Sequence, residues 1–383
     1  MANVVVVVPG WLGETEDDSF LRGGAPTLSS SARYGRIERL TWSGPVETPE
    51  AVWLGIDPRE VRLQPGPLVV AALGADPPAR SVHFQVSLLS LDDGRLSPVG
   101  TDLDRATVRR VREVGRRLDT KRLTTLWGSG TEHGLVWEGG SLDLGCTSPD
   151  RIEGRPMRAC LPEGDGESML RRFVDDSVNL LAEEEFNLRR VDEGLPPANV
   201  LWPWGPGFRN PVPNLLLERG RPLRVVSASL RMQGLARLAK ASHGSVPSLG
   251  PGSATRIESI VQACRAGEDC VALIDDFERL RAQGKLDEVE RLTHEVDRRL
   301  LGPLRDGAVG DRGRLSVVAT RPGVSAPEAD HKIECAGLML TVGAKLHVEN
   351  VYPFDERSLD ERALTKRPTW QAIEEALVWQ AVE

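Results

Sequence analysis

Five consecutive valines at residues 4–8 open the chain and lead directly into the turn Pro9-Gly10-Trp11. β-Branched residues with no polar position between them are typical of a strand buried on both faces, as in a parallel sheet covered by helices on both sides. In open α/β sheets the ligand lies at the carboxyl ends of the strands. The turn after Val8 therefore marks the place where a site would form, yet it offers no metal ligand or nucleophile before Glu14.

The length, net charge and apolar pattern of the chain limit the classes of protein to which it can belong. At 383 residues the chain exceeds a typical single domain, so a large core with a smaller inserted module is expected. A net charge of −8 argues against a nucleic-acid partner. No apolar run approaches the roughly 20 residues of a membrane-spanning helix, and the first residues carry no secretion signal. We therefore expect a cytoplasmic protein that binds no membrane, with its five widely spaced cysteines reduced.

Strand and helix patterns alternate along most of the chain. Strands are expected at residues 36–42, 198–202, 223–227, 268–276, 314–320, 336–342 and 345–348. Helices are expected at residues 28–35, 48–55, 167–193, 230–241, 286–304 and, at the end of the chain, around residues 370–379. This alternation predicts an α/β fold built on a doubly wound parallel sheet flanked by helices.

One region departs from the alternation. Residues 82–91 alternate with period two and meet the hairpin signal Asp92-Asp93-Gly94, a basic amphipathic helix follows at residues 104–118, and another strand at residues 131–137. These elements predict a small α+β cap domain at residues 81–163. It would be inserted into a discontinuous core formed by residues 1–80 and 164–383.

Several stretches together resemble the archaeal-type cofactor-independent (2,3-bisphosphoglycerate-independent) phosphoglycerate mutases, a branch of the alkaline phosphatase superfamily. Order and spacing are preserved over nearly the whole chain, although no single motif is decisive. The resemblance rests on Trp53-Leu54-Gly55-Ile56-Asp57-Pro58-Arg59, Gly66-Pro67-Leu68, Ala71-Ala72-Leu73-Gly74, Phe84-Gln85-Val86, Leu91-Asp92-Asp93-Gly94, Asn187-Leu188-Arg189, Leu195-Pro196-Pro197-Ala198-Asn199-Val200, Gly205-Pro206-Gly207, residues 234–239, and Val296-Asp297 with Gly302-Pro303-Leu304.

The resemblance implies a specific chemistry. It implies the alkaline-phosphatase-like parallel sheet, an inserted cap, two divalent metals bound by Asp and His, and a serine that is phosphorylated in transit. A phosphoryl dianion repels a nucleophile, so the metals would neutralise charge and activate the serine oxygen. Phosphate-monoester hydrolysis is among the slowest uncatalysed reactions, with enzymes reaching accelerations of up to about 10²¹-fold.

The positions that would carry this chemistry hold other residues here. The metal aspartate expected after the first strand falls on Pro9, and the nucleophilic serine falls near Val46, with Thr48 the nearest hydroxyl. The Asp-His pair expected after residues 317–318 meets Thr320-Arg321.

Few metal ligands remain at the other positions. The Asp and His expected after residues 271–274 fall on Glu278 and Ala282, and only His331 matches a family metal ligand by spacing. One such ligand cannot hold two divalent ions.

Two interpretations follow. In the first, the chain is a pseudoenzyme that keeps the mutase fold, has lost mutase activity, needs no cofactor, and acts as a binding, regulatory or scaffolding protein for a protein partner. A variant of this interpretation is a subunit that regulates an active paralogue. In the second, the chain is an active metal-dependent mutase or phosphotransferase with a rearranged site. Two Mn or Zn ions would then be held by acidic residues with one histidine, drawn from Glu14, Asp275, Asp276, Glu278 and His331.

The predicted cap and the segment after it offer candidate ligand-binding residues. His133 aligns with the histidine of an Arg-His stretch that resembles a substrate contact in the family, but Glu132 replaces the arginine and would repel an anion. Asn187, Arg189 and Arg190 could meet a small anion from the helix that follows the cap. As solvated helix residues they would need no such role.

Two indoles flank a proline in Trp202-Pro203-Trp204. Aromatic residues dominate interface hot spots, so Trp202 and Trp204 could form an exposed partner-binding knob. The alternative is that they pack the cap against the core.

Overall fold

The computed structural model describes residues 3–14, 19–42, 48–99, 103–245, 257–258, 260–262, 268–308, 313–323, 336–343, 346 and 351–378. The chain divides into two compact units. The core unit comprises Met1–Arg62 and Pro211–Glu383, and the cap unit comprises Leu63–Asn210.

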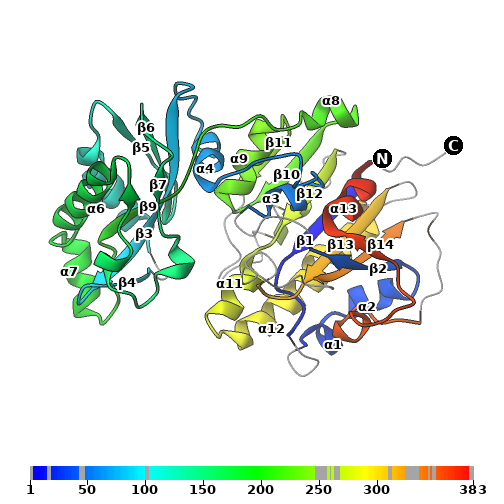
Figure 1. Ribbon diagram of the computed structural model, residues 1–383. Coiled ribbons are helices and arrows are strands. Elements are labelled where there is room, and N and C mark those ends of the chain that lie inside the picture. The colour runs from blue at the N-terminus through cyan, green and yellow to red at the C-terminus, as the bar shows by residue number, and fades with distance from the viewer. Residues whose placement is uncertain are drawn as a thin grey trace. The chain divides into compact units, whose positions relative to one another are not determined.

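The core unit is built on a mostly parallel sheet with the valine strand near its centre (Figure 1). Among the described residues eight strands follow the order β11 (Ser242–Ser245), β10 (Leu223–Ser227), β12 (Asp269–Leu273), β1 (Asn3–Val8), β13 (Arg314–Thr320), β14 (Gly337–Gly343), β2 (Arg36–Thr41) and β15 (Lys366–Pro368). β1 pairs in parallel with β12 and β13, so that Val5 lies between Val271 and Ser316. β14 runs antiparallel to both of its neighbours.

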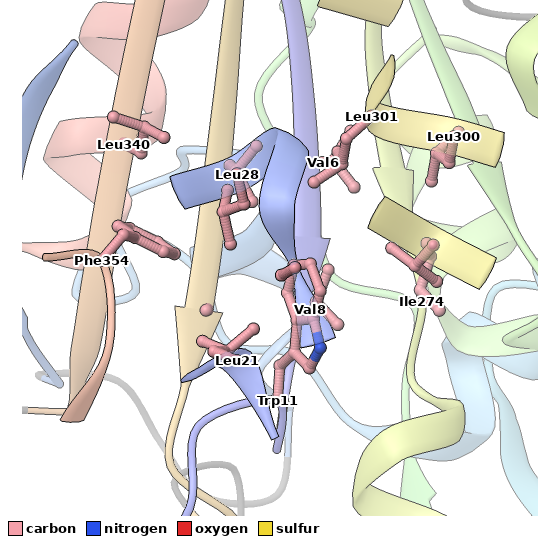
Figure 2. Packing of buried hydrophobic residues seen from close by; sticks show 14 of the residues in the cluster. Val6, Val8, Trp11, Leu21, Leu28, Ile274, Leu300, Leu301, Leu340 and Phe354 are labelled. Carbon is pink, nitrogen blue, oxygen red and sulfur yellow. The ribbon is translucent and has the colours of Figure 1, made fainter. Parts of the chain in front are cut away.

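Helices cover both faces of this sheet, which is why β1 tolerates no polar residue inside its valine run. Val4, Val6 and Val8 share one hydrophobic cluster with residues of α1 (Leu21–Gly24), α2 (Pro26–Ala32), α11 (Asp276–Ala282) and α12 (Leu286–Glu295). Figure 2 shows Val6 and Val8 with Leu21, Leu28 and Leu301 in this cluster. Val5 and Val7 point to the opposite face, are fully buried as well, and each contributes roughly 1.5–3 kcal/mol by burial. α3 (Glu50–Trp53), α9 (Leu230–Leu238) and α13 (Thr369–Val378) pack together on the sheet.

The cap unit contains an antiparallel sheet in which β3 (Ser81–Asp92) pairs with three strands. Its partners are β4 (Arg95–Pro98), β6 (Glu132–Glu138) and β9 (Val200–Gly207), and β5 (Leu123–Leu126) lies beyond β6. α5 (Arg105–Gly115) and α6 (Glu167–Leu181) contribute to the hydrophobic cluster on the Phe84 side of β3. α4 (Pro65–Ala72) packs against β3, β6 and β9, and Figure 1 shows α4 and α6 on opposite sides of the sheet.

The cap unit is wider than the expected residues 81–163. α4 precedes that range, and β9 follows it. Residues 198–202, expected as a strand of the core sheet, instead form the start of β9, which pairs with β3 so that Leu201 faces Leu88. The α/β core with a small α+β unit is otherwise as the sequence predicts.

The single helix expected at residues 167–193 is two helices in the structure. α6 ends at Leu181, and α7 (Glu185–Asp192) begins after Glu184, whose ψ of 137° lies outside the helical region. The Asn187 amide donates to the carbonyls of Leu181 and Ala198 at 2.8 and 3.0 Å and thereby fixes the bend. Apolar periodicity continues through the bend, so it gave no signal of the break.

The structure contains one strand that the sequence did not predict, and it bears on the expectations for residues 345–348, for the cysteines and for membrane-spanning helices. β11 was not expected, because its Ser-His-Gly-Ser sequence carries no apolar pattern. The strand expected at residues 345–348 lies outside the described residues, except for Leu346. Cys146, Cys160 and Cys270 form no disulfide, and no helix among the described residues is long and apolar enough to cross a bilayer.

Gly66 provides a test of the packing between α4 and β3. A Cβ at Gly66 would lie 2.2 Å from the His83 carbonyl oxygen, so the helix touches the strand backbone directly. Gly66→Ala should push α4 away and lower the free energy of unfolding by about 1–3 kcal/mol in a urea titration. The matched variant Gly130→Ala, with no atom within 4 Å of the added Cβ, should change it by less than about 0.5 kcal/mol. Equal effects of the two variants would contradict this packing.

Candidate functional site

The carboxyl ends of β1, β12 and β13 bring three turns together in the core unit. Pro9 and Gly10 follow β1, Asp275 and Asp276 follow β12, and Arg321 follows β13. Gly10 has a φ of +72°, and a Cβ there would lie 2.9 Å from the Glu278 backbone. The turn after β1 therefore packs directly on the first turn of α11.

Hydrogen bonds hold this turn in place. The Gly10 amide donates to the Thr320 hydroxyl at 3.3 Å, and the Leu12 amide donates to the Thr320 carbonyl at 3.1 Å. The Arg281 guanidinium donates through Nε to the Gly10 carbonyl at 2.7 Å. Trp11 is fully buried and donates through Nε1 to the Thr293 hydroxyl at 3.1 Å. The segment after β1 is thus anchored into the core.

The acidic residues after β12 differ in their surroundings. Burial, together with the neighbouring charge of Asp276, raises the pKa of Asp275 to about 7. The Asp276 carboxylate is 3% exposed and accepts from Arg279 at 2.8 Å. Glu278 accepts from the Gly323 amide at 3.2 Å. The Asp276 and Glu278 carboxylates are therefore engaged in holding α11 and the turn after β13.

The side chains with described placement at the carboxyl ends of β1, β12 and β13 do not fit a two-metal cluster. Pro9 offers no side-chain ligand where the resemblance implies a carboxylate, and Arg281 and Arg321 add positive charge at the same ends of the sheet. Among the residues with described placement, no group of three or more His, Cys, Asp or Glu is arranged to hold a metal ion. His331 and Val46 lie outside the described residues, so the structure says nothing about the expected last ligand or the expected nucleophile position.

Thr48 and Glu14, two further candidate site residues of the core unit, differ in solvent exposure. Thr48, the nearest hydroxyl to the expected nucleophile position, is 1% exposed. Glu14 lies on the surface after the turn. The structure does not bring Glu14 into a metal-ligating group with Asp275, Asp276 or Glu278.

The anion-binding candidates on α7 have structural partners. Asn187 is 1% exposed, and its side-chain oxygen also accepts from the Ala198 amide at 2.7 Å, so its whole amide serves the bend between α6 and β9. Arg190 is 7% exposed and donates to the Pro196 carbonyl at 2.8 Å. Arg189 is exposed and pairs with Glu185 at 3.3 Å. The three side chains therefore do not converge as a ligand-binding group.

His133 is buried in the cap unit. It is 2% exposed, its Nδ1 accepts from the Gly128 amide at 3.2 Å, and its ring lies 4.8 Å from the Trp127 ring, centroid to centroid. Burial lowers the pKa of His133 to about 3, so the imidazole is neutral at physiological pH. A neutral, buried ring is a poor partner for an anion.

A polar network on the other face of the cap sheet was missed in the sequence. Gln85 donates through its side-chain amide to the Glu132 carboxylate, and the Ser87 hydroxyl donates to it at 3.1 Å. Trp204 donates through Nε1 to the Ser87 hydroxyl at 3.0 Å. The period-two alternation of residues 82–91 was the available signal, because it places Gln85 and Ser87 on one face of β3.

The two indoles predicted as an exposed knob have different environments. Trp202 is fully buried and donates through Nε1 to the Thr147 carbonyl at 2.8 Å. It packs in a cap-unit cluster that includes Leu89, Ile152 and Val174. Trp204 is partly buried at the edge of the same cluster. The structure therefore places Trp202 in a hydrophobic core of the cap unit.

Comparisons with known proteins agree on one group. No protein-family model matches the chain. The chain is 22% identical over 317 residues to the 2,3-bisphosphoglycerate-independent phosphoglycerate mutase of Methanosarcina mazei, covering 80% of this chain and 79% of that protein. It is 24% identical over 352 residues to the enzyme of the same name from Methanothrix thermoacetophila, covering 88% of each.

Solved structures show the same likeness. The cofactor-independent phosphoglycerate mutase of Thermoplasma acidophilum aligns with a TM-score of 0.58 at 18% identity, covering 99% of this chain and 100% of that one. The PH0037 protein of Pyrococcus horikoshii aligns with a TM-score of 0.70 at 15% identity, covering 100% and 98%. The chain is therefore similar in sequence to 2,3-bisphosphoglycerate-independent phosphoglycerate mutases, and it shares with these solved structures an α/β fold on a mostly parallel sheet, as the sequence predicted.

The buried imidazole predicts acid sensitivity. Unfolded His133 takes up a proton near pH 6.5, whereas the folded ring resists protonation until about pH 3. Stability due to this group is therefore complete above pH 6.5 and falls by up to about 1.4 kcal/mol per pH unit below it. His133→Gln should flatten the pH dependence of the urea-unfolding free energy between pH 7 and 5. The control His294→Gln, on the surface of α12, should leave the wild-type slope, and a slope unchanged in both variants would refute the assignment.

The burial of Trp202 predicts a loss of stability. Trp202→Ala should lower the free energy of unfolding by about 3–5 kcal/mol, because it opens a large cavity and leaves the Thr147 carbonyl without its donor. Trp204→Phe removes one hydrogen bond and should cost only about 1 kcal/mol. Chemical denaturation of both variants measures the difference. A Trp202→Ala chain as stable as wild type would mean that the indole is not in the core.

Proposed function

We propose that the chain is a phosphoglycerate-mutase-like pseudoenzyme that has lost mutase activity and acts by binding a protein partner, in a regulatory or scaffolding role. The turn after β1 carries this proposal. Pro9 stands where a metal-binding aspartate is expected, and the Arg281 guanidinium lies on the Gly10 carbonyl beside it.

The electrostatics of the sheet edge support the proposal. Phosphoryl transfer needs cations to neutralise the charge on the transferring group and to activate the nucleophile. A divalent ion brought near Arg281 and Arg321 would be repelled, and the carboxylates that could offset this repulsion are partly committed to Arg279 and to the Gly323 amide.

The burial of the Thr48 hydroxyl and the charge of Glu132 in the cap unit also support a loss of the mutase reaction. Thr48 is buried, so an incoming phosphoglycerate could not reach its oxygen without a local rearrangement. In the cap unit, Glu132 stands beside His133 where the resemblance implies an arginine. A carboxylate held there by Gln85 and Ser87 repels the phosphate and carboxylate groups of phosphoglycerate.

The proposal is tested on the purified full-length chain. We expect no conversion of 3-phosphoglycerate to 2-phosphoglycerate above the buffer blank, with or without added Mn²⁺ or Zn²⁺, and no stoichiometric metal by mass spectrometry. The Methanosarcina mazei enzyme, purified in parallel, serves as the active control. Turnover by this chain, or two tightly bound Mn or Zn ions per chain, would instead establish the active enzyme with a rearranged site.

A second measurement addresses the nucleophile directly. Incubation with phosphoglycerate labelled with ³²P should leave no phosphoserine or phosphothreonine in the chain. Thr48→Val provides the matched control, because it removes the nearest hydroxyl at nearly constant volume. Label that is present in the wild-type chain and absent from Thr48→Val would identify an active nucleophile and overturn the proposal.

A further inference from the structure

The outer face of α7 carries an apolar row in the cap unit. Leu188 and Val191 are 55% and 57% exposed, and Leu195, just beyond the helix, is 38% exposed. The opposite face of α7 is buried through Phe186, Asn187 and Arg190. The apolar row therefore takes no part in packing α7 against the rest of the cap unit. Contiguous exposed apolar residues of this kind mark interaction surfaces.

A basic helix lies beside this row. Arg110 of α5 donates to Glu184, at the start of α7, at 2.7 Å, and so joins the two helices. Along α5 and at the residue that follows it, the exposed side chains of Arg105, Arg109, Arg112 and Arg116 recur at intervals of four, three and four residues, which places them on one side of the helix. None of these four forms an ion pair within the described part of the chain.

An acidic flank lies on the other side of the row. Helical spacing places Glu185 and Asp192 on the side of Leu188 away from Glu184 and α5. Both are exposed, and the ion pair that Glu185 forms with Arg189 is solvent-exposed and therefore weak. The surface formed by α5 and α7 thus has a basic side, an apolar centre and an acidic side. We call it the α5–α7 surface.

We propose that the α5–α7 surface binds a second copy of this chain in a two-fold symmetric dimer. In such an interface the same patch serves both subunits, so a surface must be complementary to itself. Rotation about an axis through the apolar row stacks Leu188 and Val191 on their counterparts. The same rotation sets the α5 arginines opposite Glu185 and Asp192 of the partner subunit.

The charge pattern favours a second copy over other partners. A nucleic acid or an anionic membrane would be attracted by α5 but repelled by Glu185, by Asp192 and by the net charge of −8. The row also lacks the aromatic residues that stack on bases or anchor in a lipid interface. Stable interfaces bury about 800 Å² per partner, more than three side chains supply, so α5 must take part.

The first test is the oligomeric state of the full chain. Sedimentation should show a reversible dimer, and Leu188→Glu should raise its dissociation constant at least about ten-fold, because it buries a charge at the apolar centre. Leu217→Glu is the matched control. Leu217 lies on α8 (Leu215–Arg219) of the core unit and is 78% exposed, so this variant should dimerise as wild type does.

Charge reversal tests the arrangement itself. Arg109→Glu and Asp192→Arg should each weaken the dimer about ten-fold, since each turns two symmetry-related attractions into repulsions. The double variant restores both attractions and should recover most of the wild-type affinity. This recovery would not occur if either residue acted only on folding.

Three results would overturn the proposal. They are a wild-type chain that remains monomeric at all concentrations, a Leu188→Glu chain that dimerises normally, and a double charge-reversal variant that is weaker than either single variant. None of these measurements uses mutase activity, so they test the proposed dimer independently of the proposed loss of catalysis.

Discussion

The parallel pairing of β1 with β12 and β13 is the constraint on which the core unit depends. The valines of β1 carry no polar side-chain atom, so they can be held only by backbone pairing with the two neighbouring strands, and both faces must be covered by helices. This requirement fixes where the strand ends. Pro9, Gly10 and Trp11 follow at the carboxyl edge, and Thr320, Glu278 and Thr293 hold them there.

The charged side chains at that edge determine the chemistry of the site, whereas the fold depends on the buried strands. The same fold can end its strands in carboxylates that gather cations or in guanidiniums that repel them. Arg281 illustrates this, because it stabilises the turn by donating to the Gly10 carbonyl while placing positive charge at the strand end. Likeness of fold to the mutases therefore carries no information about the reaction, which depends on a few side chains.

The sequence predicted features set by local periodicity and missed those set by long-range contacts. The valine run defined β1, and the alternation of residues 82–91 defined β3. The sheet to which β9 belongs could not be predicted, because a strand pattern does not state its pairing partner. The break between α6 and α7 depends on one amide, that of Asn187, whose partners lie at Leu181 and Ala198. The sequence could not decide between an exposed and a buried Trp202, because its burial depends on residues far away in the sequence, such as Ile152.

The hydrophobic clusters of the two units explain how a chain of this fold can change its function. The cap unit has its own clusters around Phe84 and Trp202, separate from the cluster around Val6 in the core unit. A substitution on the outside of α5 or α7 therefore disturbs neither β1 nor the turn that follows it. The cap surface can therefore vary without loss of the core fold, whereas the buried valine strand requires every helix that covers it.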